Sequence, residues 1–204
     1  MSAEILPDMD VSRETMERLS TFSDLVTKWT QRINLISSAS TADIWTRHIV
    51  DSAQLFPLAG PFRHWLDVGS GGGFPGIVIA ILAAEKSPVS KVTLVESDQR
   101  KATFLRTASR EIGLAANVLT DRIESIPSLD ADVFSARALG SLDSLLGHAH
   151  LHLTPGGIAL LPKGRNANAE IAAAQANWAF ELARCPSITD PEAAILRIKG
   201  IARA

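Results

Sequence analysis

The stretch Leu66-Asp-Val-Gly-Ser-Gly-Gly-Gly-Phe-Pro-Gly76 decides the fold of this chain. The apolar residues that lead into it predict a buried strand, and the apolar run 77–84 that follows predicts a helix. Glycine lets the backbone turn sharply and approach a ligand with no Cβ atom in the way. The helix N-terminus presents free N–H groups to an anionic group of such a ligand. The stretch therefore predicts a strand–turn–helix unit that binds a ligand.

Strand and helix patterns alternate from this turn onwards. Short apolar runs predict strands at residues 65–69, 91–96, 117–120, 132–136, 158–162 and 194–198. Longer segments predict helices at 77–84, 99–114, 142–153 and 167–183, and a turn at 155–157. This alternation is typical of an α/β fold with a mostly parallel sheet that helices cover on both faces.

The N-terminal part of the chain has a helical period instead. Ser12 is a suitable N-cap, and Glu14 in the first turn suits the helix dipole. Apolar residues then recur at three- and four-residue steps as far as Ile33, which predicts one apolar stripe. The polar residues 37–41 predict a break, and a second helix is expected over 42–56.

Gly60-Pro61 marks the boundary between the two parts. We therefore expect a helical extension over residues 1–60 and a Rossmann-like domain over residues 61–204. A length of 204 residues fits one domain with such an appendage.

Composition excludes several classes of protein. With 46% hydrophobic and 21% charged residues, the chain is not of the disordered class. Its longest apolar run, 77–84, is far below the roughly 20 residues of a membrane span. The acidic first ten residues do not resemble a secretory signal, and Cys185 is the only cysteine, so a cytoplasmic location is expected. The net charge of −2 gives no sign of nucleic-acid binding.

Two classes of ligand fit the glycine turn. Residues 71–76 match G-x-G-x-x-G, and Glu96 follows 20 residues after Gly76, which is the dinucleotide pattern. The glycines begin earlier, however, and the pattern Asp67-x-Gly69-x-Gly71 resembles the first motif of class I S-adenosylmethionine (SAM) methyltransferases. A carboxylate at position 96 suits the two ribose hydroxyls of either ligand. The motif favours SAM and leaves the dinucleotide open.

Other segments resemble one family of these methyltransferases. They are Val11–Thr15, Lys28–Ser37, Trp45–Ser52 with its Arg-His-x-x-Asp-Ser pattern, Asp67–Gly76, Arg137-Ala-Leu and Lys163-Gly164, in this order. From about residue 11 to the end, the chain resembles the RsmG (GidB) family of bacterial 16S ribosomal RNA methyltransferases. The resemblance implies transfer of a methyl group from SAM to N7 of guanosine 527 in the 530 loop. The implied partner is the small ribosomal subunit, and a monomer is expected.

The resemblance also implies which residues hold the cofactor. The residues carried over from the family are Gly69, Phe74, Glu96, Ile123, Glu124 and Arg137, and the glycine motif adds Asp67 and Gly71. The glycines and Asp67 would serve the methionine end of SAM, and Phe74 would line its path. Glu96 would bind the ribose, Ile123 and Glu124 would flank the adenine, and Arg137 would lie at the reaction mouth.

We assign no acid–base residue. Guanine N7 carries a lone pair and no proton, so positioning is expected to supply the catalysis. Because N7 is inaccessible in an RNA helix, the base must be unpaired or extruded, and cations must bind the surrounding phosphates. The candidate RNA contacts are Arg47, His48, Arg100, Lys101, Lys163 and Arg165.

Other interpretations remain open from the residues alone. His48, Asp51 and Ser52 superficially form a serine-hydrolase set, but no oxyanion turn accompanies them, and a bracing polar network is the plainer interpretation. His148, His150 and His152 point to different sides of a helix, so no metal is expected. Other candidate functions are an oxidoreductase, though without tyrosine chemistry, and a noncatalytic binding module.

Overall fold

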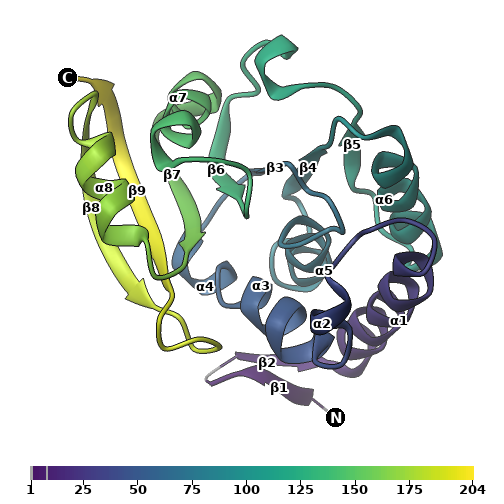
Figure 1. The fold of residues 1–204 in the computed structure, drawn as a ribbon. Helices are drawn as coiled ribbons and strands as arrows, with labels where there is room; N and C mark the ends of the chain where they lie inside the picture. The colour runs from purple at the N-terminus through teal and green to yellow at the C-terminus, as the bar shows by residue number, and fades with distance from the viewer. Residues whose placement is uncertain (1, 8) are drawn as a thin grey trace.

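A central seven-stranded sheet organises the molecule. The computed structural model describes residues 2–7 and 9–204 (Figure 1). The sheet strands are β3 (His64–Val68), β4 (Lys91–Val95), β5 (Asn117–Leu119), β6 (Ala131–Ala136), β7 (Leu153–Lys163), β8 (Trp178–Pro186) and β9 (Ala194–Arg203). Their order is β5-β4-β3-β6-β7-β9-β8; the first five strands are parallel, and β9 runs antiparallel to both of its neighbours, β7 and β8. The predicted α/β fold with a mostly parallel sheet is confirmed.

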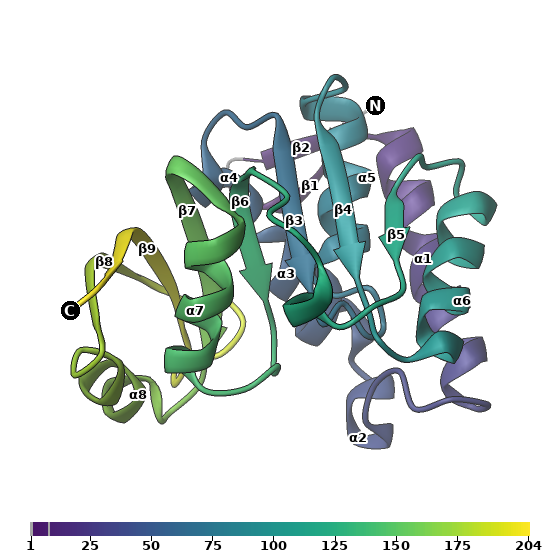
Figure 2. The same ribbon diagram turned by 90° about the horizontal axis from the view of Figure 1, so that it is seen from above.

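Helices cover both faces of this sheet (Figure 2). The connecting helices are α5 (Gly76–Lys86), α6 (Gln99–Glu111), α7 (Leu142–His152) and α8 (Ala167–Ala174), and η2 (Ile123–Ser125) is a 3₁₀ turn. Buried residues of α5 and α6 share a core cluster on one face. Those of α7, α8 and η2 share another, with Leu66, Val68 and Val95 of the sheet. Alternate residues of each central strand thus face opposite layers, as expected for a sheet buried on both sides.

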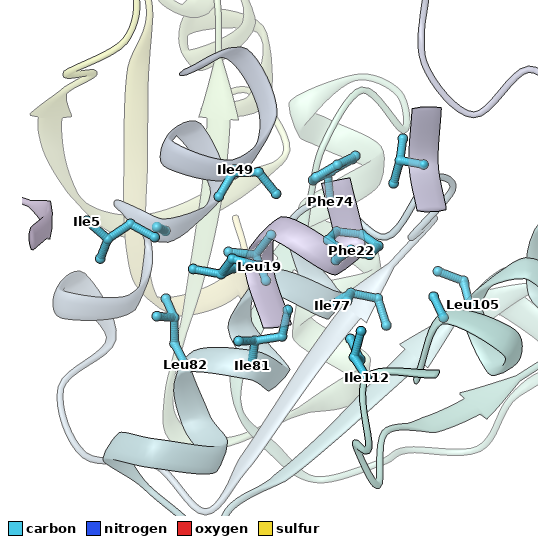
Figure 3. Close-up of a cluster of buried hydrophobic side chains, with 14 of the residues drawn as sticks. Ile5, Leu19, Phe22, Ile49, Phe74, Ile77, Ile81, Leu82, Leu105 and Ile112 are labelled. Atoms are coloured by element: carbon cyan, nitrogen blue, oxygen red, sulfur yellow. The ribbon is translucent and has the colours of Figure 1, made fainter. Parts of the chain in front are cut away.

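A hairpin that the sequence did not predict precedes the first long helix. Strands β1 (Ser2–Leu6) and β2 (Met9–Ser12) pair antiparallel and lead directly into α1 (Arg13–Thr30). The predicted N-cap is confirmed, because the Ser12 side chain accepts a hydrogen bond from the Thr15 backbone N–H. Figure 3 shows Leu19 and Phe22 of α1 among Ile77 and Ile81 of α5. The N-terminal extension therefore shares a core with the Rossmann-like part, and the division at residue 60 remains a proposal about chain organisation.

The predicted break and the expected second helix over 42–56 are replaced by four short helical pieces. They are α2 (Ser38–Thr41), within the predicted break, then η1 (Trp45–Val50), α3 (Asp51–Ala53) and α4 (Phe56–Ala59). Segment η1 is π-helical, a form that is rare and frequent at functional sites. Pro57 lies in the first turn of α4, where proline is tolerated, so it begins a helix rather than ending one.

The expected helix over 167–183 is wrong in its second half. Helix α8 ends at Ala174, and β8 begins at Trp178. Burial in β8 alternates, with Trp178, Phe180 and Leu182 more buried than their neighbours. The more buried residues in β8 recur every two positions, as in a strand. The alanines of α8 gave no sign in the sequence that the helical period ends before Trp178. The expected turn at 155–157 lies within β7, at an irregularity in its pairing with β6.

Within the described part of the chain, no helix combines the length and the apolar character needed to cross a bilayer.

Candidate functional site

The glycine turn lies at the carboxyl end of β3, between β3 and α5. Gly69, Gly71 and Gly73 have φ angles of 65°, 53° and 87°, a region that residues with a Cβ atom rarely adopt. The backbone N–H groups of Gly69 and Ser70 donate to the Val95 carbonyl of the neighbouring strand β4. The turn is therefore fixed to the sheet at the edge where α/β proteins bind their ligands.

Asp67 supports this turn from beneath. Its side chain is fully buried, with Oδ2 accepting from the Gly76 N–H at 3.2 Å and Oδ1 from the Ser135 hydroxyl at 2.7 Å. Trp65 Nε1 donates to the same Ser135 oxygen at 2.8 Å. Burial raises the pKa of Asp67 to about 6, although hydrogen bonds from Ser135, Ser70 and Gly76 oppose the rise. Asp67 therefore holds β3, β6 and the start of α5 together, and the direct cofactor contact expected for it remains untested.

Glu96 follows β4 and faces the turn. It is only 7% exposed, and its two carboxylate oxygens accept from the Gly71 and Asp98 backbone N–H groups, each at 2.8 Å. Each carboxylate oxygen has two acceptor sites, so both keep one for a further donor. The geometry suits a carboxylate that binds a vicinal diol beside the turn.

Two segments that carried the family resemblance, but whose leucines the sequence analysis gave no site role, pack directly on the glycines. A Cβ atom added to Gly69 would lie 2.5 Å from Cδ1 of Leu139, and one added to Gly72 would lie 3.0 Å from the Leu35 carbonyl oxygen. Both distances are below ordinary van der Waals contact. Leu139, from the loop after β6, covers Gly69, and Leu35, from the segment after α1, covers Gly72, so a side chain at either glycine would force its neighbour to move. The available signal was the position of these residues within the quoted segments: Leu35 lies in Lys28–Ser37, and Leu139 ends Arg137-Ala-Leu.

Arg137 joins the end of β6 to the N-terminal extension. Its guanidinium donates to Nδ1 of His48 at 2.8 Å, to Oδ2 of Asp51 at 3.3 Å and to the Arg47 carbonyl at 3.4 Å. Oδ1 of Asp51 accepts from Thr189 Oγ1 at 2.7 Å, so the network also reaches the segment between β8 and β9. The structure thus brings together residues that lie far apart in the sequence.

His48 is neutral in this network. Burial, then the charges of Arg137 and Arg47, lower the pKa of His48 to about 4. Its ring stacks on Phe74 at 4.9 Å between centroids, and Phe74 also packs 5.2 Å from Phe22. Phe74 is 4% exposed, so it supports the turn from within the core. The plainer interpretation of His48 and Asp51 as a bracing network agrees with this geometry.

The other expected cofactor residues lie near the end of β5. Ile123 is buried in the core of the α7 face, and Glu124 is exposed, 3.7 Å from Nε2 of His148. Both belong to η2, which follows β5 at the same edge of the sheet as the glycine turn. Their place beside an adenine stays a prediction.

A groove of about 930 Å³ opens beside Arg137 and contains part of the expected RNA set. Arg47, His48, Arg137 and Lys163 line it, together with Ala138, Gly140, Glu170 and Asp190. Arg165 adjoins the groove and forms an exposed pair with Glu192 at 3.6 Å. Arg100 and Lys101 lie elsewhere, in the first turn of α6 beside Glu96. The loop that carries Arg137 therefore borders both the groove, through Ala138 and Gly140, and the glycine turn, through Leu139.

Two alternative interpretations can now be compared with the geometry. Among the described residues, the Ser52 hydroxyl is buried and has no hydrogen-bond partner, so it forms no catalytic pair with His48. The histidines of α7 diverge: His148 faces Glu124, His150 contacts the Ile201 carbonyl, and His152 is buried. Residues 2–7 and 9–204 contain no cluster of three or more metal-ligating side chains.

Comparison with known proteins places this geometry in a family. The family model described as GidB, rRNA small subunit methyltransferase G, matches residues 15–195. A ribosomal RNA small subunit methyltransferase G from Cereibacter sphaeroides is 56% identical over 203 residues, covering 99% of this chain and 98% of that protein. Its counterpart from Ruegeria sp. is 54% identical over 196 residues, covering 96% of each.

Solved structures agree on the fold. A SAM-dependent methyltransferase from Aquifex aeolicus superposes with a TM-score of 0.60 at 12% identity, covering 86% of this chain and 97% of that one. A TehB-like SAM-dependent methyltransferase from Corynebacterium glutamicum gives 0.56 at 16% identity, covering 85% and 97%. The extent of the sequence matches decides the assignment: this chain belongs to the GidB family of rRNA small subunit methyltransferases.

Proposed function

We propose that this protein transfers a methyl group from SAM to N7 of guanosine 527 of 16S rRNA, in the small ribosomal subunit. The observation that carries the proposal is the glycine turn with Glu96 anchored on it, one loop away from an open groove. Membership of the GidB family supports the reaction and the class of substrate. The ribosomal substrate in turn supports a cytoplasmic location, and we propose that the enzyme acts as a monomer.

The residues at the turn fit SAM in their chemistry. Gly71 has a φ of 53° and only an ordinary contact where a Cβ atom would lie, so its backbone is open to the methionine part. Glu96 has acceptor sites left for the ribose hydroxyls, and Ile123 and Glu124 would flank the adenine. When bound, SAM supplies an activated methyl group. Asp67 and Phe74 would hold the turn in the shape that accepts it.

The groove would receive the guanine nucleotide. Arg137 lies between the turn and the groove, and its charge is balanced by Asp51. Guanine N7 has a lone pair and no proton, so the chain need only orient the base and exclude water. Arg47 and Arg165, at the exposed rim, would bind phosphates, and Lys163 and His48 line the interior. Contacts from Arg100 and Lys101 would have to come from a more distant part of the RNA.

A labelling experiment tests the reaction, the atom and the substrate together. Purified protein is incubated with tritiated-methyl SAM and small subunits from cells that lack their own copy of this enzyme, and the labelled nucleoside is mapped. We expect 7-methylguanosine at position 527 alone. Label at another guanine or on another atom would overturn the assignment of the site, and an absence of SAM binding would favour the dinucleotide alternative.

A variant of Arg137 tests whether this residue belongs to the site. Replacing Arg137 with lysine keeps the charge but loses the forked contacts to His48 and Asp51. We expect transfer to fall on the order of 100-fold, since small misplacements at a reaction centre have effects of this size. Full activity of this variant would remove Arg137 from the site.

A further inference from the structure

The loop from Arg137 to Gly140 forms the partition between the glycine turn and the groove. It connects β6 to α7, and Ala138 has a φ of 55°, an uncommon value for a residue that is not glycine. On one side Leu139 packs on Gly69, and on the other side Ala138 and Gly140 line the groove. Any movement of this loop changes both compartments together.

Two charged residues hold the far end of this loop. Nζ of Lys163, the last residue of β7, donates to the Gly140 carbonyl at 3.1 Å and to Oε2 of Glu170 at 2.8 Å. The same Glu170 oxygen accepts from the Leu142 backbone N–H at 2.9 Å. The Lys163–Glu170 pair thus fixes both ends of the turn that leads into α7.

The burial of this pair distinguishes it from a surface ion pair. The Lys163 side chain is 10% exposed and that of Glu170 29%, whereas in the Arg165–Glu192 pair the values are 77% and 62%. Two donors of the Lys163 ammonium are already used within the protein, and its charge is neutralised at close range. An RNA phosphate would have to compete with Glu170 for this ammonium group.

We propose that Lys163 and Glu170 are positioning residues, which hold the Arg137–Gly140 loop in place for methyl transfer, and that Lys163 is not an RNA contact. This inference rests on the proposed function for its kinetic consequences. Arg137 is held at the other end of the loop by His48 and Asp51. The loop is therefore braced from both ends, and loss of either brace releases the side chains that face the cofactor and the base.

The two roles predict opposite effects for one substitution. Glu170→Gln keeps an oxygen for the Leu142 N–H but removes the charge that neutralises Lys163. If Lys163 binds RNA phosphate, this change frees its ammonium and lowers KM for the ribosomal subunit. If Lys163 positions the loop, the change lowers kcat and leaves KM for the subunit unaltered.

The experiment compares four variants by steady-state kinetics on small subunits. Lys163→Met, Glu170→Gln and their combination are each expected to lower kcat on the order of 10- to 100-fold. The double variant should be no worse than the worse single variant, because both remove one contact. The combined substitution Lys199→Met with Glu181→Gln removes an exposed pair between β8 and β9 and should match the wild type. A raised KM with a shallower salt dependence for Lys163→Met, or a wild-type kcat for Glu170→Gln, would overturn the proposal.

Hydrogen exchange keeps this test separate from the test of the reaction. Faster exchange at the backbone amides of residues 138–142 in both single variants is expected, with unchanged exchange in β3 and β4. This readout needs no RNA substrate. If wild-type protein fails to methylate subunits, the proposed function fails, but hydrogen exchange still decides whether the Lys163–Glu170 pair holds the Arg137–Gly140 loop. Unchanged exchange in both variants would show that the pair does not hold the loop.

Discussion

Asp67 carries a buried carboxylate directly beneath the glycine turn. Its pKa is raised to about 6 by burial, above the ordinary value of 3.8. The folded state therefore binds a proton more readily than the unfolded state between these two pH values. It follows that the contribution of Asp67 to stability falls as pH rises from about 4 to 6, and the cost of the buried charge is complete above that range.

We predict that Asp67→Asn removes this pH dependence. The difference in unfolding free energy between wild type and variant should shift in favour of the wild type by on the order of 2 kcal/mol between pH 7 and pH 4. Urea unfolding of both proteins at pH 4, 5.5 and 7 measures it. Because the lowered pKa of His48 acts in both proteins, it cancels in the difference. A difference that is constant with pH would contradict the prediction.

Glu96 gives a second prediction at the scale of single residues. Glu96→Gln replaces one of the two oxygens that accept from Gly71 and Asp98 with an amide donor. The carboxylate for the ribose and one support of the turn are both lost, so SAM affinity should fall at least about tenfold, or roughly 1.4 kcal/mol. Calorimetric titration with SAM measures this loss. Glu111→Gln, at the exposed end of α6, is the matched control, and equal affinities for the two variants would exclude a ribose role for Glu96.

At the scale of elements, one carboxylate joins the start of α1 to the end of α5. Oε2 of Glu85 accepts from the Ser12 N–H at 2.9 Å and from Thr15 Oγ1 at 2.6 Å. Partial burial works to raise the pKa of Glu85, but the hydrogen bonds from Thr15, Ser12 and Lys86 outweigh it and lower the pKa to about 2. The stability from this contact is therefore present above pH 4.5 and is lost as pH falls towards 2.

We predict that Glu85→Gln weakens the attachment of α1. The free energy of unfolding should fall by about 1–2 kcal/mol at pH 7, and by less at pH 3, where part of the contribution is already lost. Denaturant unfolding at both pH values checks the difference, with Glu17→Gln on the exposed face of α1 as the control. An equal loss at pH 3 and pH 7 would show that the charge of Glu85 is not responsible.

Elements were predictable where one period ran without interruption. The stripe of α1 and the strand–turn–helix unit around Gly69 have such periods, and both were confirmed. Residues 42–56 were expected to form one helix, but a π-helical turn occupies 45–50 and Pro57 begins a separate short helix, and no simple period marks a π turn. Strand β8 was missed because alanine-rich sequence ran across the end of α8. Pairing with β9 makes residues 178–186 a strand despite the helical propensity of the alanines around it.

At the scale of the whole molecule, the contacts that shape the site join distant parts of the chain. Asp67 meets Ser135, Arg137 meets His48, and Leu139 packs on Gly69. The cofactor motif could be found in the sequence because its residues are contiguous. The bracing could not, because it depends on the order of the strands and on how the N-terminal extension packs against the sheet.

The charge of the whole molecule leads to the last prediction. The net charge is −2, and two of the groove cations are neutralised in place, Arg137 by Asp51 and Lys163 by Glu170. Arg47 at the exposed rim, and Arg165 beside it in an exposed pair with Glu192 that a phosphate can displace, are the cations that meet phosphates. Two phosphate contacts predict that log K for subunit binding falls with log salt at a slope of about −1 to −2.

Arg47→Gln should make the slope shallower by about 0.7, whereas Arg110→Gln, on the exposed face at the end of α6, should not change it. Filter binding at several salt concentrations measures these slopes. A slope steeper than about −4 would require a basic surface that lies outside the groove, and the recognition of RNA would then have to be assigned elsewhere on the molecule.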